Sequence, residues 1–324
     1  GLPSPPAMAP IPQRRLTVVG AGHVGMLCAE RIAQQGLASE VCLIDVAGGR
    51  ARGIALDLDQ AAAIEGWGTR VVGTDDPAAT EGSELVIVTA GKPRTPGMSR
   101  SDLLATNGRV VQSVAKYVRE RSPDAHVIVV TNPLDTMVHL MRVALGFPAR
   151  RVTGMAGVLD SARFSWFLAE ATRTSVQDVD AMVLGAHGDS MVPVTDFCTV
   201  NGVPAKHLLK RTELDALADR TRDGGAEIVK LLGTGSAFFA PASAAVAMAR
   251  SILQDERRLL PCACLLNGEY GLEGLYMGVP AVLGANGVER IVELPLDTEA
   301  RIQLQKTAGA IQRDLDALRG LGLL

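Results

Sequence analysis

One histidine lies in an unusual setting of small and polar residues. The segment 185–191 reads GAHGDSM and places His187 shortly after the apolar run 181–184. An imidazole exchanges protons near neutral pH, because its reference pKa is about 6.5. A single histidine is more often structural than catalytic, so a catalytic role depends on partners elsewhere in the chain.

The segment 158–170, VLDSARFSWFLAE, supplies two candidate partners. Asp160 and Arg163 are three residues apart at the start of an apolar helix, so they share one face of it. Read alone, they form an ordinary ion pair within a helix. Read together with His187, Asp160 would orient the imidazole, and the Arg163 fork would bind a carboxylate through two parallel hydrogen bonds.

A glycine-rich segment near the start of the chain has the spacing of a dinucleotide-binding loop. The sequence LTVVGAGHVG, residues 16–25, places Gly20, Gly22 and Gly25 between a predicted strand and a predicted helix. The first glycine permits a tight turn, the second a close approach of phosphate, and the third close packing of helix on strand. The start of the helix offers free N–H groups to a pyrophosphate. The alternative is an ordinary glycine-rich turn.

Asp45 strengthens the dinucleotide interpretation. It ends the second predicted strand, twenty residues after Gly25. A carboxylate there accepts hydrogen bonds from both ribose hydroxyls and repels a 2′-phosphate. The sequence therefore favours NAD over NADP as the cofactor.

Two arginines lie on a loop punctuated by glycine and proline. The segment 91–100, GKPRTPGMSR, carries Arg94 and Arg100 and leads into a helix that we expect Ser101 or Asp102 to cap. A mobile loop with cations could close over an anion as a lid. Two solvated surface arginines are the alternative.

The segment TNPLD, residues 131–135, ends a predicted buried strand. Pro133 removes a backbone donor and breaks the strand, so Asn132 lies at the carboxyl edge, where ligands bind in parallel sheets. A turn or cap asparagine is the alternative interpretation.

The order of apolar runs and helical segments predicts the fold that positions these residues. Short apolar runs rich in β-branched residues alternate with helical segments over the first half, as in a doubly wound parallel sheet buried on both faces. We expect strands at 16–19, 41–45, 70–72, 85–89 and 127–131, and helices at 24–35, 50–63 and 102–121.

The pattern becomes mixed after about residue 152. We expect helices at 159–171, 213–231, 238–253 and from 297 onward, strands near 180–184, 192–200 and between 259 and 292, and a hairpin turn at 201–202.

The whole pattern predicts an α/β protein with two domains. A flexible leader at 1–14 precedes an N-terminal Rossmann domain, a doubly wound parallel sheet that binds NAD, at 15–153. A C-terminal α+β domain at 154–324 would bind the substrate.

Composition excludes several classes of protein. The chain has 324 residues with 32 Lys and Arg against 35 Asp and Glu, and this small net charge of −3 argues against binding to nucleic acid or an anionic membrane. It contains no run of 18 apolar residues that would cross a bilayer.

The cysteines indicate a compartment. They are five in number and lie mostly in apolar runs, which is typical of reduced thiols in a cytoplasmic protein. Cys262 and Cys264 are too isolated from histidine for a zinc site, and we expect no metal.

Together these motifs resemble the lactate/malate dehydrogenase family from about residue 15 onward. The segments that carry the resemblance are GAGHVG, LIDV, TAGKPRTPGMSR, TNPLD, GVLDSARF and GAHGDSMVP. The resemblance implies a nucleotide-binding domain, a substrate domain, and homodimers or homotetramers with isologous interfaces.

The resemblance also implies a role for each candidate residue. The proton would move through the histidine, the aspartate would be its partner, and the arginines would hold and polarise the substrate. The implied catalytic residues are His187, Asp160 and Arg100; the implied substrate-binding residues are Arg94, Arg100, Asn132 and Arg163; the implied cofactor-binding residues are Gly20, Gly22, Gly25, Asp45, Asn107 and Asn132.

Arg94 bears on the choice of substrate. Lactate dehydrogenases of the family carry a neutral residue there, usually Gln, whereas an arginine resembles the malate enzymes, where it pairs with the second carboxylate of oxaloacetate. The resemblance therefore implies a small dicarboxylate, malate or oxaloacetate, with NAD. Lactate or another 2-hydroxy acid is the alternative substrate.

Two other classes of protein remain to be weighed. An NAD-dependent glycosidase of related fold would need a metal site of Cys and His, which the five histidines do not form with cysteine. A non-enzymatic NAD sensor would keep the glycine loop but would not need Asp160, Arg163 and His187 together.

Overall fold

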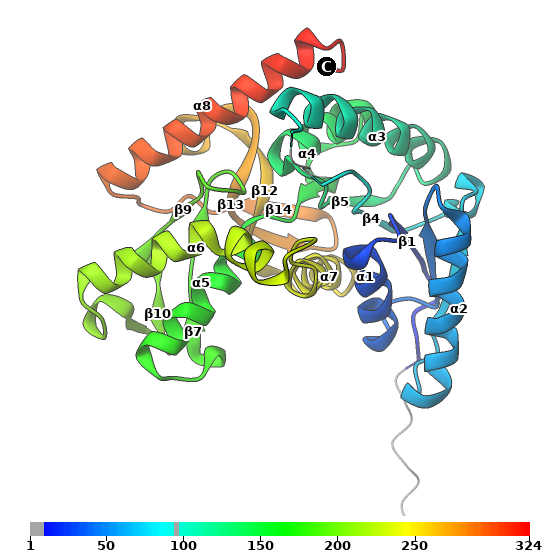
Figure 1. Cartoon of the computed structure of the whole chain (residues 1–324), viewed down its shortest axis with the longest axis horizontal. Coiled ribbons are helices and arrows are strands. Elements are labelled where there is room, and N and C mark those ends of the chain that lie inside the picture. Colours follow the sequence, from blue (N-terminus) through cyan, green and yellow to red (C-terminus); the bar gives the residue numbers. More distant parts are fainter. Residues whose placement is uncertain (1–9, 94–96) are drawn as a thin grey trace, which may run out of the picture.

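The computed structural model describes residues 10–93 and 97–324, and one large sheet runs through them from edge to edge (Figure 1). Its strand order is β14-β13-β12-β6-β5-β4-β1-β2-β3. The six strands from β6 to β3 in this order are mutually parallel. They are β1 (Arg15–Val19), β2 (Glu40–Ile44), β3 (Arg70–Thr74), β4 (Leu85–Val88), β5 (His126–Val129) and β6 (Val152–Gly154).

The parallel half of the sheet has the order 3-2-1-4-5-6, which is that of a Rossmann fold. Successive strands are added on one side of β1 (β2, β3) and then on the other (β4, β5, β6), so the strand order switches between β1 and β4. In such sheets ligands bind at the switch point, in the crevice outside the carboxyl ends of the strands. The predicted doubly wound sheet is confirmed.

Helices cover both faces of the sheet. Leu16 and Val18 of β1 point into one apolar cluster together with α1 and α7, whereas Val19 points into a second cluster with α3 and α4. Figure 1 shows α3 and α4 on one side of the strands and α1 and α7 on the other. The helices are α1 (His23–Gln34), α2 (Gly48–Glu65), α3 (Arg100–Arg121), α4 (Leu134–Leu145), α5 (Gly157–Thr172), α6 (Arg211–Leu232), α7 (Phe239–Leu253) and α8 (Thr298–Gly320).

The second half of the chain extends the sheet with three antiparallel strands. They are β12 (Arg258–Asn267), β13 (Glu273–Gly284) and β14 (Gly287–Ile291). The first of them pairs with β6 through Ala263 and Gly154, so the two halves share one continuous hydrogen-bonded layer.

Five short strands form two small sheets beside the large one. The hairpin turn predicted at 201–202 is confirmed, since Asn201 and Gly202 both have positive φ between paired strands. The single strand predicted at 192–200 is wrong: Pro193 lacks a ladder donor, and a 3-10 turn, Thr195–Phe197, interrupts the segment. The strands are β7 (Val179–Asp180), β8 (Val183–Leu184), β9 (Val192–Pro193), β10 (Thr199–Val200) and β11 (Val203–Pro204).

The structure also corrects the start of α3. Ser99, not Ser101 or Asp102, caps this helix: its hydroxyl accepts from Asp102 N at 3.0 Å, and the Asp102 carboxylate accepts from Ser99 N at 3.0 Å. Arg100 is therefore the first residue of the helix and not part of the preceding loop. The sequence analysis also overlooked α4 and β6.

The predicted leader lies only partly within the described residues. Residues 1–9 lie outside them, while Arg14, at the end of the predicted leader, donates a hydrogen bond from Nη1 to the Leu253 carbonyl at 2.9 Å. Among the helices of the described residues, none is both long and apolar enough to span a membrane.

Candidate active site

The glycine loop joins β1 to α1 in the way a dinucleotide site requires. Gly20 has φ +102°, and a Cβ on Gly25 would lie 1.8 Å from the Gly20 carbonyl oxygen, so these two positions exclude side chains. Nothing lies within 4 Å of a Cβ built on Gly22, which caps α1 without a side chain. This leaves an open approach to the N–H groups of the first helical turn, and a pyrophosphate fits there.

Asp45 lies beside the loop and also holds it in place. Its Oδ2 accepts from Ala21 N at 2.7 Å and its Oδ1 from Ala47 N at 2.8 Å. Arg50 holds the next peptide of the loop, donating from Nε to the Ala21 carbonyl at 2.7 Å. The structure thus adds Arg50, which the sequence analysis missed.

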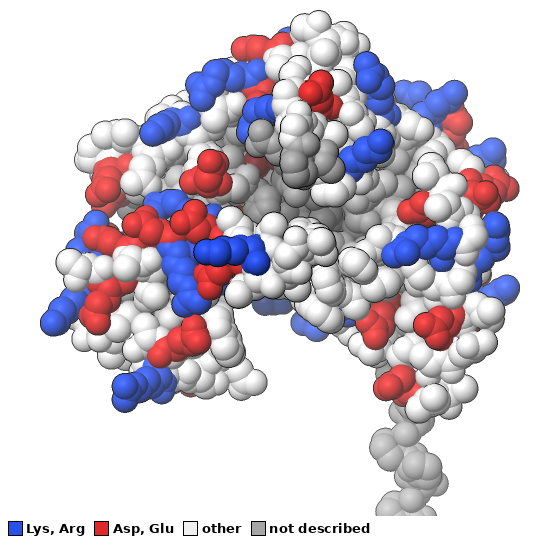
Figure 2. Space-filling view, in the orientation of Figure 1, with Lys and Arg blue, Asp and Glu red and all other residues white. Residues whose placement is uncertain are grey.

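A cleft of about 500 Å³ connects the glycine loop to the predicted catalytic residues. Gly22 and Gly25 line one part of it, and Asn132, Arg163 and His187 line another. The surface is hollowed near the centre of the view in Figure 2, beside α7 of Figure 1. A cofactor bound at the loop and a substrate bound at Arg163 would therefore meet in one space, which we call the cleft.

His187 and Asp160 form the predicted pair. His187 Nδ1 lies 2.9 Å from Asp160 Oδ2, although the two residues come from different elements. The Asp160 side chain is only 2% exposed and that of His187 18%. Burial lowers the pKa of His187, but the charge and hydrogen bond of Asp160 outweigh it, so the pKa lies above its ordinary value of 6.5. The pair can hold a proton on the imidazole and leave Nε2 for a substrate.

Arg163 is a buried cation with an incomplete set of partners. Its Nη1 lies 3.5 Å from Asp160 Oδ1 and its side chain is 12% exposed, while its Nε has no hydrogen-bond partner among residues 10–93 and 97–324. Burial lowers the pKa of this guanidinium, and the charge of Asp160 offsets part of that effect. Since Arg163 lines the cleft, a carboxylate there would satisfy its unused donors.

Asp135 is a functional candidate that the sequence analysis missed. Its Oδ2 accepts from the His187 backbone N–H at 2.9 Å, and its Oδ1 is buried with no hydrogen-bond partner in the part of the chain that the structure describes. It therefore fixes the backbone of the histidine, while Asp160 fixes the ring. The segment TNPLD could have indicated this residue, because it places an acidic side chain two residues after Pro133, next to apolar residues.

Asn107 and Asn132 lie together in the wall of the cleft. The Asn107 amide donates to the Lys92 and Asn132 carbonyls at 3.0 and 2.7 Å and accepts from Lys92 N at 2.8 Å. These contacts commit the Asn107 side chain to shaping the wall. Asn132 lines the cleft beside His187, as its predicted role requires.

The two predicted lid arginines lie in different situations. Arg94 lies outside the described residues. Arg100 binds Asp314 of α8, with its Nε 2.7 Å from Oδ1 and its Nη2 2.5 Å from Oδ2. Nothing in the sequence marked Asp314 as its partner, because the two positions are 214 residues apart.

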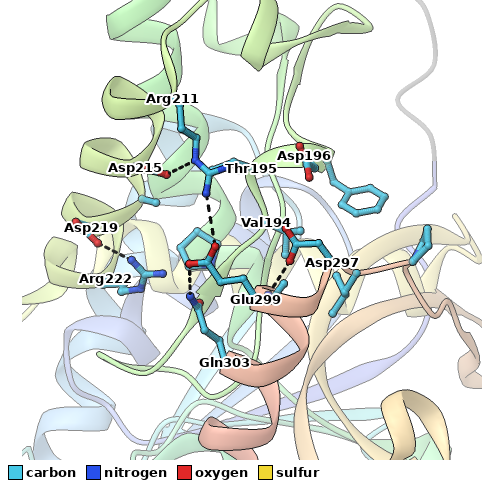
Figure 3. Close-up of a pocket in the computed structure, with 16 residues that line it drawn as sticks. Val194, Thr195, Asp196, Arg211, Asp215, Asp219, Arg222, Asp297, Glu299 and Gln303 are labelled. Atoms are coloured by element: carbon cyan, nitrogen blue, oxygen red, sulfur yellow. Dashed lines mark hydrogen bonds and ion pairs between the residues drawn. The ribbon is translucent and has the colours of Figure 1, made fainter.

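A separate pocket of about 410 Å³ lies between the starts of α6 and α8. Figure 3 shows Arg211 between Asp215 and Glu299, with N···O distances of 2.8 and 3.7 Å, and Arg222 beside Asp219 at 2.6 Å. Its arginines are thus already paired with acids, and no predicted site residue lines it. Among residues 10–93 and 97–324, no three His, Cys, Asp or Glu side chains gather as a metal site requires.

Comparison with known proteins gives one consistent result. Residues 14–154 match the description "lactate/malate dehydrogenase, NAD binding domain", and residues 157–319 match "lactate/malate dehydrogenase, alpha/beta C-terminal domain". The chain is 47% identical over 307 residues to a malate dehydrogenase of Roseiflexus sp. (strain RS-1), which covers 95% of this chain and 99% of that protein.

Solved structures agree with these matches. A malate dehydrogenase of Salinibacter ruber has a TM-score of 0.91 at 46% identity, covering 95% of this chain and 98% of that one. A lactate dehydrogenase of Cryptosporidium parvum, complexed with lactic acid and NAD, has a TM-score of 0.91 at 40% identity, covering 95% and 99%.

Replacing Asp135 by Asn tests its buried charge. Burial raises the pKa of Asp135 from 3.8 to about 7, so the folded chain keeps a proton that the unfolded chain has lost. The stability that this proton provides is complete below about pH 4 and is lost as the pH rises to about 7. Asn still accepts from His187 N–H but carries no charge. The free energy of unfolding of Asp135→Asn, measured with urea, should therefore exceed that of wild type by an amount that grows between about pH 4 and about pH 7. A gain that does not depend on pH would contradict the assignment.

Proposed function

The chain belongs to the lactate/malate dehydrogenase family, and we propose that it is an NAD-dependent malate dehydrogenase. The observation that carries this proposal is the cleft, which brings an Asp-paired histidine and a buried, under-used arginine to the same space as a dinucleotide loop. These groups serve proton transfer, carboxylate binding and cofactor binding.

NAD is the cofactor, as the match to an NAD-binding domain indicates. The glycine loop and the first turn of α1 would hold its pyrophosphate, and Asp45 lies where the adenosine ribose is expected. Bound there, NAD would supply the hydride acceptor for oxidation at C2 of malate, and NADH the hydride donor for the reverse reaction.

His187 carries the proton in this proposal. In malate oxidation its Nε2 takes the hydroxyl proton as the carbonyl forms, and in oxaloacetate reduction it gives the proton back. Asp160 keeps the ring oriented through Nδ1 and stabilises the imidazolium. Arg163 binds the C1 carboxylate, which places the hydroxyl above the cofactor site.

Three further assignments accompany the proposal. Residues 15–153 would bind the cofactor and residues 154–324 the substrate. A homodimer or homotetramer is supported by exposed apolar side chains of which Ile64, Trp166 and Phe239 are 87%, 54% and 62% exposed, and the mass in solution measures the number of subunits. A cytoplasmic location is supported by five cysteines that are all free and buried.

The wild-type protein should prefer oxaloacetate and NADH. Pyruvate lacks the second carboxylate, and we expect kcat/KM for oxaloacetate to exceed that for pyruvate roughly a thousandfold. NADPH should be at least about tenfold worse than NADH, because its 2′-phosphate would face the Asp45 carboxylate. Steady-state rates with the four combinations test both statements. A preference for pyruvate would contradict the malate assignment but not the dehydrogenase assignment. Equal use of NADH and NADPH would contradict the role of Asp45.

Arg94→Gln should reduce the preference of the enzyme for oxaloacetate over pyruvate. Oxaloacetate and pyruvate share the groups that Arg163, Arg100 and His187 are expected to contact, so an additional cation must recognise the C4 carboxylate. Losing this charge-assisted hydrogen bond should lower kcat/KM for oxaloacetate about ten- to a hundredfold and raise it for pyruvate. Arg121→Gln removes an equal charge from the far end of α3 and should leave the ratio unchanged. An unchanged ratio in Arg94→Gln would exclude Arg94 as the selecting residue.

Asp160→Asn should move the pH profile of reduction to lower pH. Oxaloacetate reduction needs a protonated His187, so kcat/KM falls as the pH rises through the pKa of that residue. Since Asp160 raises this pKa, its neutral replacement should shift the fall toward acid and lower kcat, while KM for NADH stays near wild type. A profile at the same pH as wild type would show that another group supplies the proton.

A further inference from the structure

Arg100 and Asp314 form an ion pair that the proposed reaction does not use. Both nitrogens on one edge of the Arg100 guanidinium face the two carboxylate oxygens of Asp314, in the fork-to-fork geometry that is strongest for this pair. In the described part of the chain, the other hydrogen bond to this carboxylate comes from Thr136 Oγ1 at 3.4 Å.

The two partners differ in freedom. The Asp314 side chain is 9% exposed on the inner face of α8, whereas the Arg100 side chain is 61% exposed at the first residue of α3. The capping box of Ser99 and Asp102 stabilises the start of α3, from which the long Arg100 side chain extends into solvent. Arg100 is therefore the partner that moves.

The pair lines a cavity whose charged side chains are mainly acidic, whereas those of the cleft are basic. A space of about 310 Å³ is lined by Arg100, Asp314, Asp135 and Asp189, and we call it the acidic cavity. It shares Asn132 and His187 with the cleft, so the two spaces meet at the predicted proton donor. Asp189 and Asp314 place two carboxylates beside one arginine, which does not favour entry of a dicarboxylate. The substrate would bind on the Arg163 side, and Arg100 would have to leave Asp314 to reach it.

We propose that Asp314 is the resting partner of Arg100, a positioning residue that competes with the substrate for this guanidinium and thereby sets KM for oxaloacetate. The inference rests on the proposed function and on the role that the family resemblance implies for Arg100, which is to polarise the substrate carbonyl. If Arg100 is free of Asp314 for only a fraction of the time, the apparent affinity for oxaloacetate is reduced by that fraction. Thr136 stabilises the carboxylate after Arg100 has left and so favours the exchange.

Asp314→Asn should lower KM for oxaloacetate about three- to tenfold, since the neutral amide holds Arg100 less tightly. KM for malate should fall by a similar factor, and KM for NADH should not change. Asp314→Glu keeps the charge and should stay closer to wild type than Asn.

Thr136→Val should act in the opposite direction. It removes the hydroxyl that donates to Asp314 Oδ2, so release of Arg100 becomes more costly and KM for oxaloacetate rises. This variant keeps the proposal testable if Asp314→Asn does not fold, which thermal unfolding will show.

Asp316→Asn is the matched control. Asp316 also lies on α8 and pairs with Arg319 at 2.6 Å, but its side chain is 62% exposed. The same loss of charge there should leave KM for oxaloacetate unchanged.

The outcomes separate this inference from the proposed function. If a folded Asp314→Asn has an unchanged or higher KM, Asp314 orients Arg100 or only supports the fold, and the inference is wrong. If Arg100→Gln has wild-type kcat/KM for oxaloacetate, the role of Arg100 in the proposed function is wrong as well. If Arg100→Gln is impaired and Asp314→Asn matches wild type, only the inference fails.

Discussion

Asp160 is a carboxylate with almost no access to water, and the arrangement of the candidate site follows from its charge. A buried carboxylate without partners would cost several kcal/mol. The chain provides His187 at 2.9 Å and Arg163 at 3.5 Å, and each of these gains something from the carboxylate. The imidazole gains orientation and a raised pKa, and the guanidinium keeps its charge in a buried place.

Asp160 lies on α5, so the fold must position the segment of His187 next to that helix. The segment that carries His187 is hydrogen-bonded to the fold at Gly185 and at the backbone of His187 itself. Gly185 exchanges backbone hydrogen bonds with Gly278 of β13 at 2.9 and 3.0 Å, and Asp135 of α4 accepts from His187 N. The large sheet and the helix after β5 thus set the position of the residue together, which explains why one continuous sheet underlies both halves of the chain.

Charge is divided between the two sides of His187. The cleft presents Arg163 with unused donors, whereas the acidic cavity presents the carboxylates of Asp189 and Asp314 beside Arg100. A dicarboxylate is therefore attracted to the side where the glycine loop also opens. The opposite side keeps a second arginine close to the reacting position without exposing an unpaired cation to the cleft.

Local sequence was sufficient for much of the fold and for the chemistry of the site. Buried parallel strands have continuous apolar runs because both faces are covered, so β1 to β5 could be predicted from the position of these runs. Gly20, Gly22 and Gly25 could be predicted because a tight turn before a helix restricts residue type at fixed spacing. Helix α4 was not predicted, because Pro133 precedes it and no side chain caps its start, and β6 is only three residues long.

What the sequence determined by itself was which groups are present: a histidine among small residues, an arginine on an apolar helix and a glycine-rich loop between a strand and a helix, each recognisable from the residues next to it. The tertiary structure decided which groups meet. His187 reaches Asp160 across 27 residues and Asp135 across 52, and Arg100 reaches Asp314 across 214. Such partners have no spacing rule, because helices and strands of variable length separate them and only packing against a common sheet brings their side chains within hydrogen-bonding distance.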